Sequence, residues 1–172
     1  MTARTPGQTV GPFFAFGLEY HGDSALVPPG TPGAVRLHGR VLDGAGDPVP
    51  DALIELWQAD PAGRVVRQPG SLHRDGHTFT GWGRAATDRT GTYSFTTLTP
   101  GESSGGPPYF ALCVFARGLL DRLFTRAYLP GHQPDGPLSS LVATEDAQGY
   151  RFDIHLQGDG ETVFLHHRRT QD

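Results

Sequence analysis

Histidines are the first residues in this sequence that could do chemistry, because several neutral imidazoles can share one metal ion when their spacing allows it. Eight are present. His73 and His77 are four residues apart, but the Arg-Asp-Gly between them predicts a turn, so both are expected to be solvated loop side chains. His166 and His167 are adjacent and would face opposite sides of a strand. The spacing therefore predicts no histidine metal site.

The other reactive side chains form no recognisable catalytic motif. Asp153 and His155 alternate on an expected strand, which indicates an ordinary polar outer face. Ser103 lies in Ser-Ser-Gly-Gly rather than in the Gly-x-Ser-x-Gly elbow of hydrolases, and there is no phosphate or dinucleotide loop. Cys113, the single cysteine, lies in an apolar run, which favours a small buried hydrophobic side chain over a reactive thiol and excludes an internal disulfide.

Composition indicates one domain with many turns. The chain has 172 residues, of which 37% are hydrophobic, and it carries 24 glycines and 15 prolines. The net charge is -4 and every basic residue is arginine, with no basic patch that would suggest nucleic acid. No apolar run approaches the roughly 20 residues of a membrane span, and the first residues lack the layout of a signal peptide. We therefore expect a cytoplasmic protein.

The hydrophobic pattern predicts an all-β fold, a two-sheet β-sandwich of about eight short strands with at most one short helix. Residues 1–33 are rich in glycine and proline, and are expected to form an extended N-terminal arm that packs on a partner, while residues 34–172 form the sandwich. A helix is expected over 137–146, and residues 88–91 are expected to form a hairpin-type turn. The expected strands are 34–41, 52–57, 83–87, 92–98, 109–116, 123–128, 150–156 and 162–166.

Several sequence stretches, spread in order over nearly the whole chain, resemble one family. They are Thr-Pro-Gly-Gln-Thr-Val-Gly-Pro-Phe-Phe at 5–14, Gly-Arg-Val-Leu-Asp at 39–43, Leu-Trp-Gln-Ala-Asp at 56–60 with Gly63-Arg64, Phe-Ala-Arg-Gly at 115–118, Thr-Arg-Ala-Tyr at 125–128, Tyr-Arg-Phe-Asp at 150–153 and Gly-Glu-Thr-Val-Phe at 160–164. Together they resemble the intradiol ring-cleaving dioxygenases, and in particular the alpha chain of a heteromeric member that acts on protocatechuate.

The resemblance implies an iron site that this chain has lost. In that family two tyrosines and two histidines of the beta chain hold a ferric ion, a hard Lewis acid suited to such ligands. The corresponding positions here are Val65, Ser103, Tyr109 and Ala111. Valine and alanine have no donor atom, so no metal is expected in this chain and Fe(III) is expected on a partner beta chain. Tyr109 is then expected to be a core or interface aromatic residue.

The resemblance also implies a contribution to the partner's pocket. In the family the alpha chain's Thr-x-Gly-Pro segment and the arginine of its Ala-Arg-Gly turn help to line the iron pocket of the beta chain. Here these residues are Thr9, Val10, Gly11, Pro12 and Arg117. Glycine permits close approach to a ligand, proline fixes the direction of the arm, and an arginine could position an anionic carboxylate.

The function implied is that of a noncatalytic alpha subunit in a hetero-oligomer of alpha-beta units. With the iron-bearing beta chain it would cleave protocatechuate, using O2, to 3-carboxy-cis,cis-muconate. Two alternatives stay open. The chain could be a stand-alone β-sandwich binding module whose arm is dispensable. It could also be a self-sufficient dioxygenase with relocated ligands, for instance His73 or His77.

Overall fold

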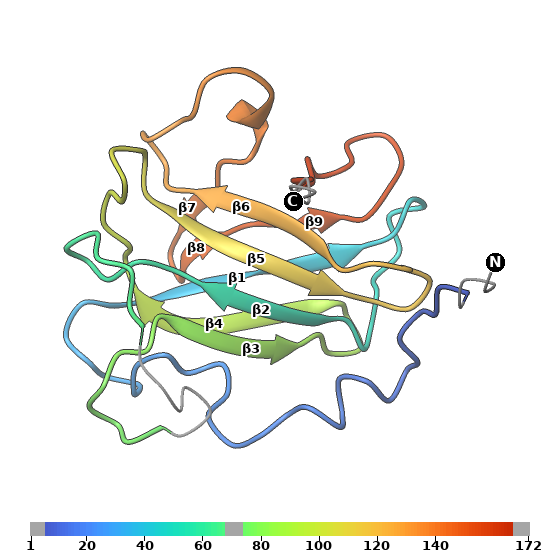
Figure 1. Ribbon diagram of the computed structural model, residues 1–172, viewed down its shortest axis with the longest axis horizontal. Coiled ribbons are helices and arrows are strands. Elements are labelled where there is room, and N and C mark those ends of the chain that lie inside the picture. Colours follow the sequence, from blue (N-terminus) through green and yellow to red (C-terminus); the bar gives the residue numbers. More distant parts are fainter. Residues whose placement is uncertain (1–5, 68–73, 167–172) are drawn as a thin grey trace, which may run out of the picture.

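Two β-sheets make up the fold in the computed structural model, which describes residues 6–67 and 74–166 (Figure 1). One is a five-stranded sheet in the order β4-β1-β8-β7, with β9 also paired to β1, and the other is a four-stranded sheet in the order β3-β2-β5-β6. The elements are β1 (Ala34–Leu42), β2 (Leu53–Trp57), β3 (Trp82–Ala86), β4 (Thr92–Leu98), β5 (Tyr109–Phe115), β6 (Leu123–Tyr128), the 3-10 helix η1 (Gly136–Ser140), β7 (Thr144–Asp146), β8 (Gly149–Arg151) and β9 (Ile154–His155). The predicted two-sheet, all-β architecture is confirmed.

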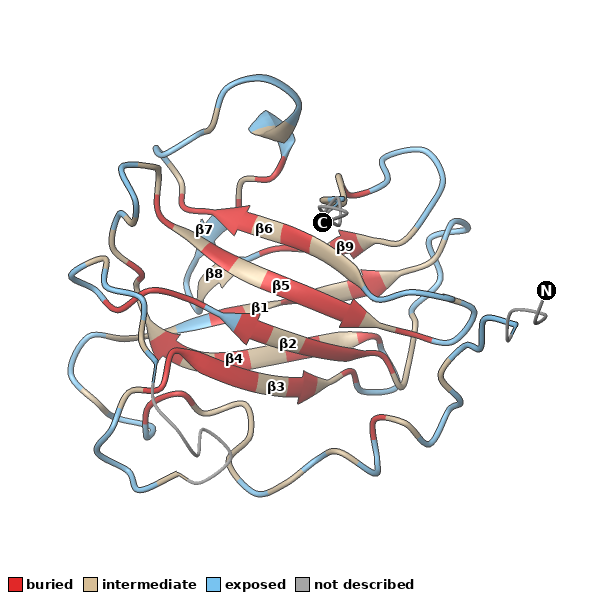
Figure 2. Ribbon diagram, viewed as in Figure 1, coloured by how far each residue is buried: buried red, intermediate tan, exposed pale blue. Residues whose placement is uncertain are grey.

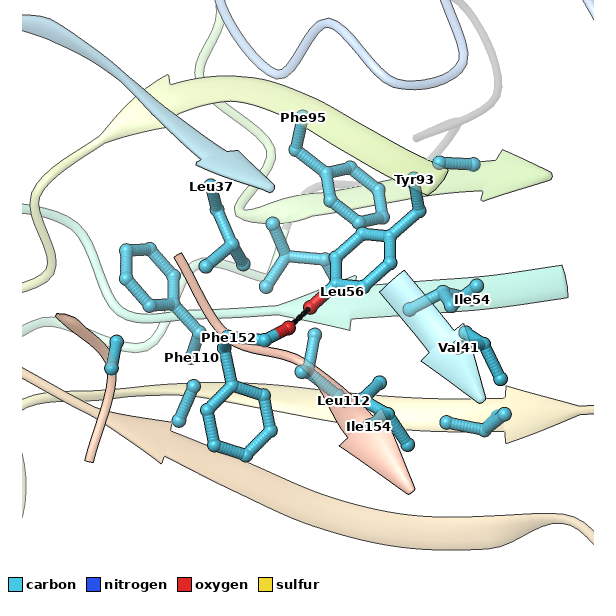
Figure 3. Packing of buried hydrophobic residues seen from close by; sticks show 14 of the residues in the cluster. Leu37, Val41, Ile54, Leu56, Tyr93, Phe95, Phe110, Leu112, Phe152 and Ile154 are labelled. Carbon is cyan, nitrogen blue, oxygen red and sulfur yellow. Dashed lines mark hydrogen bonds between the residues drawn. The ribbon is translucent and has the colours of Figure 1, made fainter. Parts of the chain in front are cut away.

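The core lies between the inner faces of the two sheets, and strand alternation explains its composition. On β1 and β4 every second side chain is buried, so Leu37, Val41 and Phe95 face inward. From the other sheet Leu56 and Phe110 meet them in one hydrophobic cluster (Figure 3). The four-stranded sheet is buried on its inner side, and Figure 2 shows the resulting buried bands along β2, β3 and β5.

A hydrogen bond inside the core fixes the position of the C-terminal strands. The Tyr93 hydroxyl donates to the Phe152 carbonyl at 2.6 Å, and both groups are buried (Figure 3). Gly39 lies opposite Tyr93 in the β1–β4 register, and a Cβ at Gly39 would collide with the Phe152 carbonyl. A glycine in β1 therefore lets the C-terminal segment approach closely enough to receive the tyrosine's hydrogen bond.

This approach explains why the strand predicted over 150–156 is interrupted. β8 and β9 both pair with β1 in parallel, and between them the Phe152 amide still donates to the His38 carbonyl at 2.8 Å, but two other groups there bond to side chains. The Phe152 carbonyl accepts from Tyr93, and the Asp153 carboxylate accepts from the Arg40 amide at 2.9 Å. Because side chains take these bonds in place of backbone groups, one predicted strand becomes two short ones.

Three other predictions of local structure are wrong. Residues 162–166 form no strand. The Leu165 amide donates to the Phe124 carbonyl and the Thr125 hydroxyl donates to the Val163 carbonyl, so the segment lies beside β6 without a full ladder of backbone hydrogen bonds. The helix predicted over 137–146 is limited to η1, and β7 occupies the end of that range. The turn at 88–91 joins β3 to β4, which lie in different sheets, so it connects the two layers and closes no hairpin.

The N-terminal arm lies along its own sandwich in the part that the structure describes. Leu26 and Val27 are buried, and the amides of both donate to the carbonyl of Thr96 in β4. Figure 1 shows the arm passing the turn between β5 and β6 and then running along the outside of β3. Whether other parts of it also pack on a partner stays a prediction. In residues 6–67 and 74–166, no helix has the length and apolarity needed to cross a membrane.

We predict that Tyr93→Phe destabilises the fold by about 1–3 kcal/mol, because the buried Phe152 carbonyl loses its donor while the ring keeps its packing. Urea unfolding of the purified chain measures the change. Tyr109→Phe is the matched control, since it removes a hydroxyl from the outer face of β5, and it should stay within about 0.5 kcal/mol of wild type. Equal destabilisation by both substitutions would show that the Tyr93 hydrogen bond has no special role.

Candidate functional site

The loop after β2 is built by residues of the Trp-Gln-Ala-Asp motif. Buried Gln58 donates to the Leu98 carbonyl at 2.8 Å and accepts from the Thr97 hydroxyl at 2.6 Å, which ties the end of β2 to β4. Asp60 accepts from the amides of Ala62 and Arg64 and forms an ion pair with the Arg64 guanidinium at 2.8 Å. The backbone hydrogen bond from Arg64 is the main reason that the pKa of Asp60 is lowered. These motif residues give the loop a fixed shape.

The fixed loop presents Val65, the first of the four residues that the family resemblance places at iron-ligand positions. Gly63 comes against the backbone of Glu102, and a Cβ there would collide with the Glu102 carbonyl. Val65 pairs with Ala59 in an isolated bridge, and 65% of its surface is exposed. The valine side chain offers no atom to a metal ion.

The other three expected ligand positions do not complete a donor set. Ser103 lies in the loop before β5, and Tyr109 and Ala111 lie on the outer face of β5. The last two line a hollow of about 440 Å³, whereas Val65 lines a different one. The Arg126 guanidinium lies 4.2 Å from the centre of the Tyr109 ring. A positively charged side chain therefore lies against the tyrosine, where a metal cation would be repelled.

These residues do not fit a ferric ion. Of the four positions only Ser103 and Tyr109 carry a side-chain oxygen, and roughly four protein ligands are needed. In the part of the chain that the structure describes, no three side chains of His, Cys, Asp or Glu are grouped so as to hold a metal ion. We therefore derive no chemistry through iron held by this chain.

A second group of predicted site residues comes together at the opposite end of β5. The amide of Gly118 donates to the Thr9 hydroxyl at 2.8 Å, so the arm is joined to the Ala-Arg-Gly turn. The rings of Phe14 and Phe115 pack 5.5 Å apart and reinforce this contact. Val10 is half-buried, whereas Gly11 and Pro12 are exposed. The structure thus brings the arm residues 9–12 and Arg117 into one surface.

Arg117 is held in place by a residue that the sequence reasoning missed. Its Nε lies 3.1 Å from the carboxylate of Asp51, and about half of the arginine side chain remains exposed. Asp51 has a left-handed backbone with φ of 63°, and its second carboxylate oxygen is buried without a hydrogen-bond partner. The ion pair uses the Nε edge of the guanidinium, so its terminal nitrogens can still donate to an anion. Only a Pro-Asp turn in the sequence could have suggested Asp51.

The arm is fixed further along by two arginines that the sequence reasoning also missed. Arg84 donates to the Leu18 carbonyl at 3.0 Å and pairs with Glu55 at 2.7 Å. Arg74 donates to the carbonyls of Asp23 and Trp82. Both guanidinium groups lie within 6 Å of the Trp82 ring, at 5.9 Å for Arg74 and 5.2 Å for Arg84. These contacts with the four-stranded sheet, together with the hydrogen bonds to Thr96 of β4, fix the course of the arm.

Two other reactive residues, His77 and Cys113, behave as the sequence predicts. His77 is exposed in its loop. Cys113 is buried, and burial raises its pKa to about 12, which leaves the thiol protonated and unreactive near neutral pH. His73 and His167 lie outside the described residues.

Comparison with known proteins agrees with the motifs. The sequence profile of the family described as "Dioxygenase" matches residues 10–132. The chain is 35% identical to the protocatechuate 3,4-dioxygenase alpha chain of Burkholderia cepacia, over 94% of this chain and 96% of that one. The chain belongs to the intradiol dioxygenase family. It is also 34% identical to the protocatechuate 3,4-dioxygenase beta chain of B. cepacia, over 74% of this chain and 66% of the other.

Solved structures support the same fold. The dioxygenase domain of a dioxygenase carbohydrate-binding protein fusion from Streptomyces sp. SirexAA-E superposes with a TM-score of 0.60 and 25% identity, covering 91% of this chain and 99% of that one. The family resemblance seen in the sequence is confirmed.

We predict that Thr9→Val loosens the arm from the Ala-Arg-Gly turn. The valine has the shape of threonine but cannot accept from the Gly118 amide, so hydrogen exchange at that amide should become about fivefold faster, as expected for one hydrogen bond of ~1 kcal/mol. Amide exchange followed by NMR measures the rate. Thr9→Ser keeps the acceptor and should exchange like wild type; identical rates in all three proteins would contradict the contact.

Proposed function

We propose that this chain is the iron-free alpha subunit of a protocatechuate 3,4-dioxygenase. With a beta chain that holds Fe(III), it would cleave protocatechuate between its two hydroxylated carbons. Both atoms of O2 enter the product, 3-carboxy-cis,cis-muconate, one on each carbon of the broken bond. We propose the cytoplasm as its location, which suits a chain whose single cysteine is buried and needs no disulfide.

The extent of the similarity supports assignment to the alpha chain. The match to the B. cepacia alpha chain covers almost all of both sequences, whereas the match to the beta chain covers about two thirds of the latter. The loss of ligand atoms at Val65 and Ala111 points the same way, because a chain that carried the iron would need them.

The observation that carries the proposal is the hydrogen bond between Thr9 and the Gly118 amide. It gathers residues 9–12 and Arg117 at one end of β5, while Tyr109 and Ala111 lie at the other. The six residue steps of β5 span roughly 20 Å, since an extended strand rises about 3.3 Å per residue. Arg117 therefore lies too far from this chain's own degenerate positions to serve them, and its surface suits a centre on another chain.

Exposed apolar side chains surround this surface and suit a subunit contact. Phe13, Phe16 and Leu120 are all large, and each exposes two thirds of its surface or more. Phe13 and Phe16 belong to the arm, and Leu120 lies in the turn that follows Arg117. Covering them with a beta chain would bury apolar area next to the residues proposed to line the pocket.

Each pocket residue has a physical role in the proposal. Arg117, steadied by Asp51, would attract the substrate's carboxylate and orient it with charge-assisted hydrogen bonds. Gly11 has open space around its Cα, so its backbone can lie against a ligand, and Pro12 restricts the direction in which the arm continues. The ferric ion of the beta chain would supply the redox and Lewis-acid chemistry.

Co-expression tests this function. We expect the chain to co-purify with a beta chain encoded by the adjacent open reading frame, and the complex to contain iron and to consume O2 on addition of protocatechuate. The lone chain should contain no stoichiometric iron and show no activity. Oxygen uptake by the lone chain would overturn the proposal, and failure to form any complex would favour a stand-alone binding module.

In the active complex, Arg117→Ala should raise KM for protocatechuate about 10- to 100-fold, as expected for losing a charged hydrogen bond of ~1.5–3 kcal/mol, and should lower kcat less. Arg117→Lys keeps the charge but not the planar fork, so its KM should be intermediate. Arg89→Ala removes an exposed arginine from the turn between β3 and β4, and serves as the control. Steady-state oxygen uptake gives both constants, and a KM unchanged by Arg117→Ala would remove this residue from the pocket.

A further inference from the structure

The hollow beside Tyr109 and Ala111 has features of a ligand site in its own right. It lies on the outer face of β2, β5 and β6, has a volume of about 440 Å³ and falls within the range of small-molecule pockets, roughly 300–1,000 Å³. Its lining includes Trp57, Tyr109, Ala111, Phe124, Arg122 and Arg126.

Strand register explains why the surface is hollowed at this point. Trp57 pairs with Ala111 across β2 and β5, and Ala111 pairs with Arg126 across β5 and β6. Side chains in one such row point to the same face of the sheet. The small alanine therefore lies between two large groups and forms the floor of the hollow, while the indole and the guanidinium form opposite walls.

Trp57 is the more accessible of the two aromatic walls. Half of the surface of Trp57 is exposed, which is high for a tryptophan in the middle of a sheet. Tyr109 packs at a tilt against Tyr128, with ring centres 5.6 Å apart, and its ring is also covered by Arg126. A planar ring placed over Ala111 would be flanked by these aromatic groups, which favour offset or edge-to-face packing.

The hollow also carries an excess of positive charge in a chain that is acidic overall. Arg126 donates to the Tyr128 hydroxyl at 3.1 Å, and Arg122 lies 5.2 Å from the centre of the Phe124 ring. Within residues 6–67 and 74–166, neither guanidinium forms a salt bridge to a carboxylate. Glu55, the one acidic residue of the lining, is paired with Arg84 at 2.7 Å. Two arginines are therefore available to an incoming anion.

We propose that this hollow binds a planar aromatic carboxylate without transforming it. The ring would lie over Ala111 between Trp57 and Tyr109, and the carboxylate would accept hydrogen bonds from Arg126, with Arg122 adding charge at the rim. Val65 and Ala111 supply no metal ligands, so the bound molecule is not activated for cleavage. This site goes beyond the proposed function, because none of the residues assigned to hold the ligand is Arg117 or belongs to residues 9–12, although Phe115 of the lining packs on Phe14 of the arm.

The test uses the two tryptophans as reporters. The full-length chain, labelled with 5-fluorotryptophan, gives two 19F resonances, which Trp57→Phe assigns. Titration with benzoate should shift the Trp57 resonance in a saturable way and raise the Tm, since a ligand that binds the native state stabilises it. Benzamide lacks the charge and cyclohexanecarboxylate lacks the planar ring, so each should bind at least tenfold more weakly.

Substitutions locate the bound ligand. Arg126→Gln should weaken benzoate binding at least tenfold, and Ala111→Leu, which fills the floor from the outer face, should abolish it. Arg89→Gln removes an arginine of the turn between β3 and β4 and should leave affinity unchanged. A wild-type Trp57 resonance that does not respond to 10 mM benzoate would overturn the proposal, as would equal binding of benzamide or full affinity in Arg126→Gln.

The same labelled chain, in complex with a beta chain, separates a ligand site from a buried interface. Retention of the Trp57 response in the complex supports the ligand site, whereas its loss would assign the hollow to the subunit interface and overturn the proposal. Neither result bears on the proposed function, which is tested by iron content, oxygen uptake and the KM effect of Arg117→Ala.

Discussion

The contact on which the sandwich depends most is the close approach of the Phe152 carbonyl to Gly39 beneath the Tyr93 hydroxyl. It joins three segments that are far apart in the sequence, namely β1, β4 and the link between β8 and β9. A carbonyl buried in an apolar core would be costly without a donor, and a side chain at position 39 would prevent its approach. One glycine and one tyrosine hydroxyl thus allow the C-terminal segment to complete the sheet that contains β1.

Completion of that sheet leaves the second sheet free to present its outer face. Along β5 the residues that point inward, such as Phe110 and Leu112, are fully buried in the shared core. Tyr109 and Ala111, which alternate with them, point outward. The inner face provides the stability, so the outer face can change without unfolding the domain. This division allows a small side chain at position 111 without loss of the fold of the intradiol dioxygenases.

The two ends of β5 consequently have separate roles. At one end lies the loop built by Gln58, Asp60 and Gly63, next to Tyr109 and Ala111 of the hollow. At the other end Thr9 and Arg117 come together on a surface with exposed apolar side chains. The strand separates Tyr109 from Phe115 by roughly 20 Å, so under our proposal Arg117 serves an iron centre on a second chain.

The fold class, the family and the lack of donor atoms at Val65 and Ala111 follow from the amino-acid sequence, because they rest on local alternation, short motifs and side-chain chemistry. The sequence also predicts β1, β2, β4 and β6 closely, since their apolar residues alternate or run together. Long-range contacts, in contrast, make residues 88–91 link two sheets, break the strand over 150–156 at Phe152 and pair Asp51 with Arg117. Those features depend on contacts between residues distant in the chain, and no local pattern encodes which carbonyl will meet Tyr93 or which small residue will lie between Trp57 and Arg126.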